Sequence, residues 1–226
     1  MKTITKITTL ILCMAGFAAC DMDRLWDKDY LFEVVEPQDG VFIYDCSSYT
    51  KWNFFSFAKG EIIGSCDAMD AEANEQWRKR TDWDLAFHRQ NIKTNSGASG
   101  IGMGGILKYP QETFDFDAIL EAPEEGYQTD VQDSVIYDMS GMMTGSIGYA
   151  YTGLAQPVKG WAVLTDMQNG VWTYVQSAFI VRTATGKYAK IYLRNFKSDV
   201  GASGTVTMQY VYQDDGTINL DIKIKK

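Results

Sequence analysis

Hydrophobic and polar residues alternate along most of the chain from Val41 onward. The alternating runs, rich in β-branched and aromatic residues, are "VFIYDCS", "WNFFSFAKGEIIG", "WDLAFHRQ", "SVIYDM", "WAVLTDM", "VWTYVQSAFIVRT", "YAKIYLRNF", "GTVTMQYVYQD" and "TINLDIKIK". Such a period of two predicts half-buried strands. Turn signals separate several of the runs, at 58–60, 168–170, 184–186 and 214–216. The pattern predicts one all-β, mostly antiparallel domain over residues 41–226.

One segment departs from this alternation. The stretch "DAMDAEANEQWRKR" at 67–80 carries alanine, glutamate and arginine and predicts a single short helix. Strands and helices do not alternate regularly along the chain, so a parallel α/β fold is not expected.

The first residues have the layout of an export signal rather than of a folded element. Lys2 and Lys6 precede a run of about ten apolar residues, too short to span a bilayer, which takes about 20. The run ends in "FAAC", which resembles a bacterial lipobox. We therefore expect residues 1–19 to be a lipoprotein signal peptide.

Cys20 would then become the lipidated first residue of the mature chain, with enough acyl chains for stable anchoring. An ordinary secretory signal with an incidental cysteine is the alternative. The acidic, aperiodic residues 20–40 are typical of a tether between a lipid anchor and a domain.

Composition limits the classes of function. The 226 residues are 46% hydrophobic and 13% aromatic, enough to bury a sizeable core. Loss of residues 1–19 removes Lys2 and Lys6 and leaves 19 basic and 29 acidic side chains, a formal net charge of −10. So acidic a chain lacks the positive charge that nucleic-acid binding requires, and we expect no such partner.

Two cysteines remain in the mature domain beside Cys20, in the oxidising setting of an exported protein. Cys46 and Cys66 lack the CxxC spacing of a zinc or redox site. A disulfide between them and two separate buried thiols both stay open.

No catalytic constellation is visible, and we expect a protein that is not an enzyme. Ser/His/Asp chemistry would have to use His88, and no serine has a nucleophile-elbow motif near it. The glycine-rich stretch around Met103 lacks the spacing of a phosphate-binding loop.

Methionines occupy two glycine-containing loops, where a packed core does not need them. "MSGMMTG" places Met142 and Met143 in one loop, and "TDMQNG" places Met167 in the other. Methionine usually fills gaps in cores, whereas turns mostly face water. The other common use of a thioether is as a soft metal ligand.

Five blocks resemble the HmuY family of haem-binding lipoproteins of Bacteroidetes. The blocks are "YTKWNFFSFAKGEII", "TDWDLAFHRQNIKTNSGASGIGMGGI", "GWAVLTDM", "FIVRTATGKYAKIYLRNF" and "GTVTMQYVY", in family order over residues 41–213. The resemblance implies a hand-shaped all-β fold in which two finger-like projections hold haem, iron protoporphyrin IX, edge-on. It places the axial ligands between "SVIYDM" and "WTYVQS".

The ligand set implied by the resemblance departs from the bis-histidine pattern of the best-known member. The single histidine, His88, lies far upstream and is expected to be structural. The first ligand position falls near Met143, with Met142 as the alternative, and the second falls at Met167. Met139 falls at a strand end and is expected in the core.

The resemblance implies a surface lipoprotein that behaves like a haemophore. It would take haem from host haemoproteins and pass it to a TonB-dependent outer-membrane receptor. We expect it in the outer membrane, facing the cell surface through its lipid anchor, and also as a shed form. Homo-oligomers stay open. The alternative is a surface adhesion or glycan-binding lipoprotein of the same fold without haem.

Overall fold

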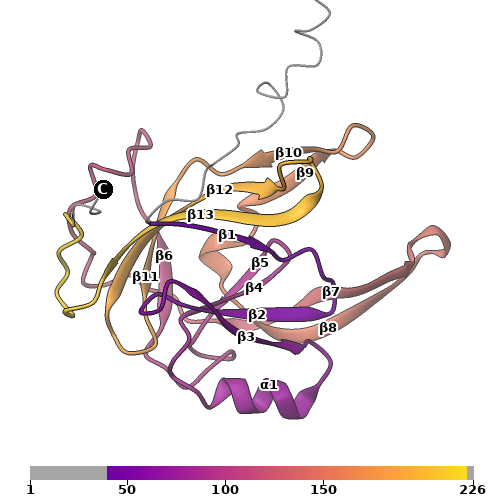
Figure 1. Ribbon diagram of the computed structural model, residues 1–226, viewed down its shortest axis with the longest axis horizontal. Helices are drawn as coiled ribbons and strands as arrows, with labels where there is room; N and C mark the ends of the chain where they lie inside the picture. Colours follow the sequence, from indigo (N-terminus) through magenta and orange to yellow (C-terminus); the bar gives the residue numbers. More distant parts are fainter. Residues whose placement is uncertain (1–39, 223–226) are drawn as a thin grey trace, which may run out of the picture. The chain divides into compact units, whose positions relative to one another are not determined.

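The computed structural model describes residues 40–222, and two antiparallel sheets form its framework (Figure 1). The first sheet has the strand order β1–β13–β12–β11–β6, and the second has the order β3–β2–β4–β5. The strands of the first sheet are β1 (Val41–Asp45), β6 (Gly105–Lys108), β11 (Ala178–Arg182), β12 (Tyr188–Lys197) and β13 (Ser203–Gln213). Those of the second are β2 (Lys51–Ser56), β3 (Glu61–Asp67), β4 (Leu85–His88) and β5 (Asn91–Thr94).

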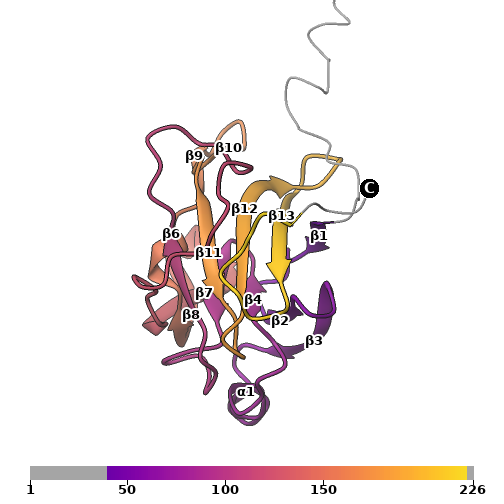
Figure 2. The same ribbon diagram turned by 90° about the vertical axis from the view of Figure 1, so that its left-hand side faces the viewer.

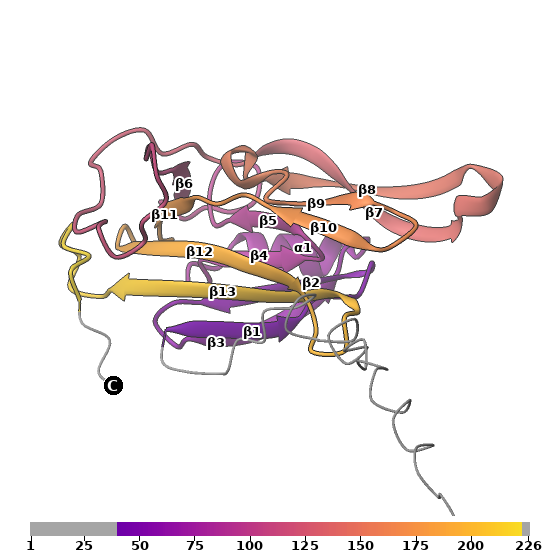
Figure 3. The same cartoon turned by 90° about the horizontal axis from the view of Figure 1, so that it is seen from above.

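Two hairpins complete the strands: β7 (Val131–Gly141) with β8 (Ser146–Leu154), and β9 (Ala162–Asp166) with β10 (Val171–Tyr174). Both project toward the same end of the domain, and the β7–β8 hairpin reaches further (Figures 1 and 3). They are separate from the two sheets in hydrogen bonding. The tips of both hairpins are therefore free of the framework that holds their bases.

The main core contains side chains from both large sheets. Phe55 and Phe87 of the second sheet and Ile191 and Met208 of the first belong to one buried cluster. Figure 2 shows β11, β12 and β13 in view together with β2 and β4. Because alternate residues of a strand point to opposite faces, the other face of each sheet needs a cover of its own.

The helix α1 (Ala71–Arg78) and the base of the β7–β8 hairpin cover the second sheet. Asp70 caps the helix by accepting a hydrogen bond from the Ala73 amide at 3.0 Å. Trp77 stacks on Phe54 with ring centroids 4.0 Å apart. Gly64 is required here, because a Cβ on it would lie 2.6 Å from the Trp77 ring.

The outer face of the first sheet is covered by chain without regular strands. Phe116 and Ile119 from one long connection join Leu220 from the C-terminal segment in a third cluster. The strand predicted at 217–225 is wrong over its described part, where Asn219 makes only an isolated bridge to Glu121. That segment covers the sheet instead of extending it.

The predicted fold class is confirmed: the described chain is mostly antiparallel β with one α-helix, within the predicted 67–80. Two short 3-10 helices, η3 (Met142–Thr144) and η4 (Gln156–Val158), were not foreseen. The proposed signal peptide at 1–19, Cys20, and all of the tether except Gly40 lie outside the described residues. Within residues 40–222, no helix is both long and apolar enough to cross a membrane.

Candidate ligand-binding site between two hairpins

The β7–β8 hairpin carries two of the candidate methionines at its tip. Strand β7 ends at Gly141, and the 3-10 turn η3 then presents Met142 and Met143. Gly145 closes the turn with φ 78°, a left-handed value that glycine adopts without strain. The side chain of Met143 is 90% exposed and that of Met142 is 48% exposed. Neither methionine fills a core, which leaves both thioethers free to contact a ligand.

The β9–β10 hairpin presents Met167 in the same manner. Asp166 ends β9 and accepts hydrogen bonds from the Gln168 and Asn169 amides at 3.0 and 3.1 Å, which forms the turn. A hydrogen bond from the Asn169 carboxamide, at 2.7 Å, together with these amide bonds holds the pKa of the Asp166 carboxyl below its usual value. Met167 is 80% exposed. Exposed large apolar side chains thus sit at both tips, as sequence reasoning anticipated.

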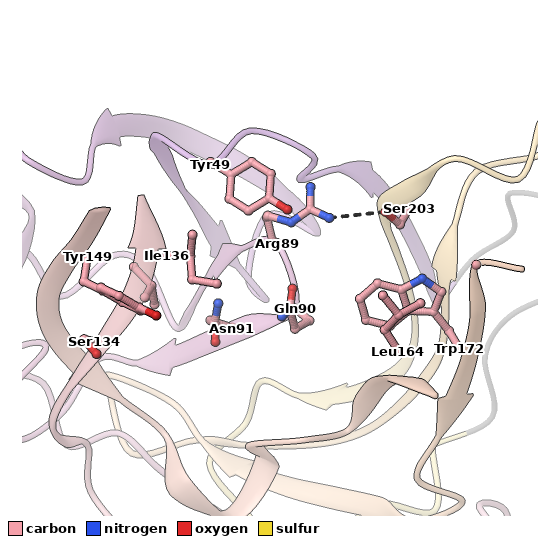
Figure 4. Close-up of a pocket in the computed structure, with 12 residues that line it drawn as sticks. Tyr49, Arg89, Gln90, Asn91, Ser134, Ile136, Tyr149, Leu164, Trp172 and Ser203 are labelled. Carbon is pink, nitrogen blue, oxygen red and sulfur yellow. Dashed lines mark hydrogen bonds between the residues drawn. The ribbon is translucent and has the colours of Figure 1, made fainter. Parts of the chain in front are cut away.

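A groove of about 360 Å³ lies between the two hairpins (Figure 4), beside the first half of β7 and along β9–β10 as far as Gly170 in its turn. This volume falls in the usual range of small-molecule pockets. Its lining residues come from both hairpins, from the β4–β5 turn and from the loops before β2 and at the start of β13. They are Tyr49, Arg89, Gln90, Asn91, Ser134, Val135, Ile136, Tyr149, Leu164, Gly170, Trp172 and Ser203.

The two side walls of the groove are apolar cross-strand pairs. Ile136 is opposite Tyr149 on one hairpin, and Leu164 is opposite Trp172 on the other. Residues directly opposite in a ladder share one face, so each pair presents a joint surface. The Trp172 ring packs edge-on against Phe196, with ring centroids 4.8 Å apart. These walls suit a flat, apolar ligand.

The inner end of the groove is polar. The β4–β5 turn places Arg89, Gln90 and Asn91 there, and Tyr49 lies beside the guanidinium (Figure 4). Burial lowers the pKa of the Arg89 guanidinium, yet arginine keeps its proton in proteins. The groove therefore combines aromatic walls with a permanent positive charge.

The methionine tips are not part of this groove as the structure stands. Met142 lies six residues beyond Ile136 on the hairpin, about 20 Å of extended chain. Gly170 lines the groove, and Met167 is three residues from it. The structure thus places the candidate ligands on the two projections that flank the groove, and none of their side chains lines it.

Met139 lies on β7, closer along the chain to Ile136 than Met142 and Met143 are. The ladder is bulged: Ile136 pairs with Tyr149, whereas Asp138 pairs with Gly148. A second irregularity follows between Asp138 and Gly141, and Met139 lies within it, so the ladder assigns Met139 no partner and no fixed face. The prediction that Met139 belongs to the core is not met, because it is half-buried and outside the three core clusters.

His88 has the surroundings of a structural residue, as expected. It is fully buried, its Nε2 lies 2.7 Å from the Tyr49 carbonyl oxygen, and its ring packs at 5.1 Å from that of Trp52. Burial lowers the pKa of the imidazole below 6.5. His88 is not among the residues that line the groove.

The cysteine question is settled in favour of two separate thiols. Cys46 and Cys66 are both free and buried, one in the main core and one in the cluster beneath α1. Burial raises the pKa of Cys66 to about 11 and that of Cys46 further still, so both stay protonated.

Of the aromatic residues that flank the methionine loops, Tyr149 and Trp172 line the groove. Tyr151 is exposed, and Tyr174 donates a hydrogen bond to Asn195 at 2.9 Å. Sequence reasoning missed Arg89, Gln90 and Leu164. Arginine and glutamine between the apolar runs "LAFH" and "NIKT", where a tight turn calls for glycine or asparagine, were the signal that could have identified the first two.

The comparison with protein families assigns the chain to a class. The model of the HmuY protein family matches residues 48–210, and the chain belongs to this family. No curated protein matches the sequence.

Three solved structures are similar in fold. A Bacteroides vulgatus protein described as HmuY-like and haem-binding has 26% identity and a TM-score of 0.60, with 79% of this chain and 95% of that chain covered. Apo PinO from Porphyromonas gingivitis has 21% identity and a TM-score of 0.60, with 78% and 98% covered. The apo HmuY analogue of Tannerella forsythia has 22% identity and a TM-score of 0.57, with 80% and 99% covered.

Proposed function

We propose that this chain binds haem in the groove between its two hairpins and acts as a lipid-anchored haem carrier. The single observation that carries the proposal is the groove itself, flanked by two projections that each present an exposed thioether. Membership of the HmuY family supports it, as does the likeness to a Bacteroides vulgatus protein described as haem-binding.

The residues of the groove fit a porphyrin in kind. Its walls are apolar and aromatic, from Ile136 and Tyr149 on one side and Leu164 and Trp172 on the other. A large flat macrocycle needs such walls, with a few polar groups to set its orientation. The carboxamide oxygen of Gln90 is buried without a hydrogen-bond partner in the described chain, so the polar end has unused capacity.

The axial ligands in this proposal are one methionine from each hairpin. Met167 serves from β9–β10, and Met143 or Met142 serves from β7–β8. Met139 enters as a third candidate on β7–β8, because it lies on β7 three residues beyond Ile136, which lines the groove. Thioethers are soft ligands that suit haem iron and raise its reduction potential.

The proposed carrier role also involves a lipid anchor and an outer-membrane receptor. We propose that Cys20 anchors the chain to the outer membrane at the cell surface and that a TonB-dependent receptor takes the haem, which host haemoproteins supply. Replacement of Cys20 by serine should abolish lipidation and leave a soluble or unprocessed form. A Cys20→Ser protein that still incorporates labelled palmitate would contradict the anchor.

The direct test of the binding function is a haem titration of single alanine variants of Met139, Met142, Met143 and Met167. Wild type should give a sharp low-spin spectrum at micromolar haem. Met167→Ala and one of the β7–β8 variants should each lose it. Met103→Ala is the matched control, because Met103 is also exposed but lies outside both hairpins.

Two outcomes of these titrations would contradict the proposal. A low-spin spectrum that survives all four substitutions would refute thioether ligation. Absence of a Soret shift in wild type at micromolar haem would refute haem binding and favour the adhesion or glycan-binding alternative.

A further inference from the structure

Arg89 occupies a backbone position that normally belongs to glycine. Strand β4 ends at His88 and β5 begins at Asn91, so Arg89 and Gln90 form a two-residue hairpin turn. Arg89 has φ 51° and is the only non-glycine residue with positive φ among residues 40–222. A turn with positive φ at its first central residue alone favours glycine there. An arginine at this place costs conformational energy, and such strain is concentrated at functional sites.

The Arg89 side chain is buried, and no carboxylate of residues 40–222 forms an ion pair with it. It is only 9% exposed and lines the inner end of the groove. Its Nη1 donates to the Ser47 carbonyl oxygen at 2.8 Å, and its Nη2 donates to Ser203 Oγ at 3.2 Å. The guanidinium also lies over the Tyr49 ring, with Cζ 4.1 Å from the ring centroid. These contacts hold the group firmly in place.

None of those contacts supplies a negative charge from the described part of the chain. Arg89 makes no salt bridge with any acid of the described segment. Asp45 acts on it only from a distance, and its Oδ1 accepts the Ser47 amide at 2.8 Å instead. A buried charge without a partner is costly. The guanidinium has five donors, of which two are used, so it can still bind an anion in the groove.

The Gln90 side chain is a second polar group at the inner end of the groove with an atom that is unpaired within residues 40–222. Its Oε1 is buried and makes no hydrogen bond within the described chain, although Gln90 also lines the groove. Rotation of the carboxamide places Nε2 where Oε1 stands, because the two atoms are interchangeable in shape. The unpaired Gln90 oxygen is an acceptor that lacks a donor in the described chain; with the carboxamide turned over, the same position holds a donor, which an anionic ligand can use together with the unused donors of Arg89.

We propose that Arg89, with Gln90 beside it, binds a carboxylate of the ligand held between the hairpins. This inference rests on the proposed haem function, in which the carboxylate belongs to a haem propionate. The propionate edge would then point inward to the β4–β5 turn. Arginine suits this role because its planar guanidinium matches a carboxylate in two parallel hydrogen bonds.

The test compares haem with haem dimethyl ester, which keeps the macrocycle and the iron but carries no negative charge on its propionates. Affinities of both ligands are measured for wild type, Arg89→Asn and Arg89→Gly. Both substitutes tolerate positive φ, so the turn is retained and only the guanidinium is lost. Arg78→Asn removes an equal charge from α1, away from the groove, and is the control for net charge.

Wild type and Arg78→Asn should prefer haem over the ester by roughly ten- to hundredfold, as expected for charge-assisted hydrogen bonds. Arg89→Asn and Arg89→Gly should show almost no preference, with an unchanged low-spin spectrum because the axial ligands lie elsewhere. An equal preference in all four proteins would overturn the inference while leaving haem binding intact. Failure of wild type to bind either ligand would refute the proposed function, and this inference with it.

Discussion

The ammonium group of Lys159 lies 2.6 Å from Oδ2 of Asp133. Asp133 belongs to β7, and Lys159 follows η4 in the connection that leads into β9. Gln156 Nε2 donates to the same carboxylate oxygen at 3.0 Å. These contacts tie the bases of the two hairpins together, and they hold the pKa of the Asp133 carboxyl down at about 2.

Loss of these contacts between the hairpin bases should weaken haem binding in the groove more than it lowers the free energy of unfolding. Because the pair is partly exposed, we expect Asp133→Asn to cost less than about 1 kcal/mol of unfolding free energy. Haem affinity should fall by up to about tenfold. Asp138→Asn is the matched control, since Asp138 is on the same strand without an ion pair in the described chain. Equal haem affinity for both variants and wild type would contradict the role of the tie.

The same pKa defines the pH window of the tie. An acid whose pKa is lowered on folding stabilises the fold above its unfolded pKa, near 3.9, and loses this contribution as the pH falls through its folded pKa. For Asp133 the loss begins below about pH 4 and is complete only below about pH 2. Between pH 5.5 and 7.5 the hairpin bases therefore stay joined.

Trp161 joins the second hairpin to the β4–β5 turn. Its indole Nε1 donates to the Gln90 carbonyl oxygen at 2.8 Å, and its ring is buried against Phe196. Trp161→Phe leaves a carbonyl without its donor and should lower the unfolding free energy by about 1–3 kcal/mol in urea denaturation.

Trp172→Phe gives the contrasting result. Trp172 is only half-buried and lines the groove, so its substitution should weaken haem binding with little loss of stability. A larger stability loss for Trp172→Phe than for Trp161→Phe would refute this division of roles.

The oxidation state of the iron should matter to binding. Two thioether ligands favour ferrous over ferric iron compared with two imidazoles. We expect reduced haem to bind more tightly than oxidised haem when both are titrated anaerobically with and without dithionite. Equal affinities for the two states would count against a pair of methionine ligands.

Alternation in the sequence predicted most of the strands, including the long β12 and β13, but no predicted run covered β5 (Asn91–Thr94) or β6 (Gly105–Lys108). It failed for β8, "SIGYAYTGL", where glycines at 148 and 153 weaken the pattern and pairing with β7 decides the structure. It also failed at 217–222, where strand-forming residues found no sheet edge and packed Leu220 into the third cluster instead. Local preference cannot foresee which edges tertiary packing leaves open.

The site was predictable only in part, for a similar reason. Met142, Met143 and Met167 stand out because methionines in glycine-containing turns lack a packing role. The groove between the hairpins is built from residues far apart in the sequence, such as Tyr49, Arg89 and Trp172. Their proximity depends on how the sheets and hairpins pack, which no single stretch of sequence encodes.

Two buried groups make the stability of the fold depend on pH in opposite directions. Burial lowers the pKa of the His88 imidazole. Below about pH 6.5 the imidazole is therefore protonated in the unfolded chain but not in the folded chain, and the free energy of unfolding falls as the pH falls. Burial raises the pKa of Asp130 to about 6, so stability rises as the pH falls through that value. Neither residue lines the groove, and the two effects oppose each other.

The most direct test of thioether ligation is a haem titration between pH 7.5 and 5.5 for wild type, Met167→Ala and His88→Gln. Glutamine is chosen because its Nε2 can keep the contact with the Tyr49 carbonyl oxygen. Protons compete with iron for imidazole but not for a thioether, whose sulfur does not titrate in this range. We predict nearly constant affinity across the range for wild type, an unchanged low-spin spectrum for His88→Gln and its loss in Met167→Ala. A collapse of affinity near pH 6, together with loss of the low-spin spectrum in His88→Gln, would show that His88 is the iron ligand.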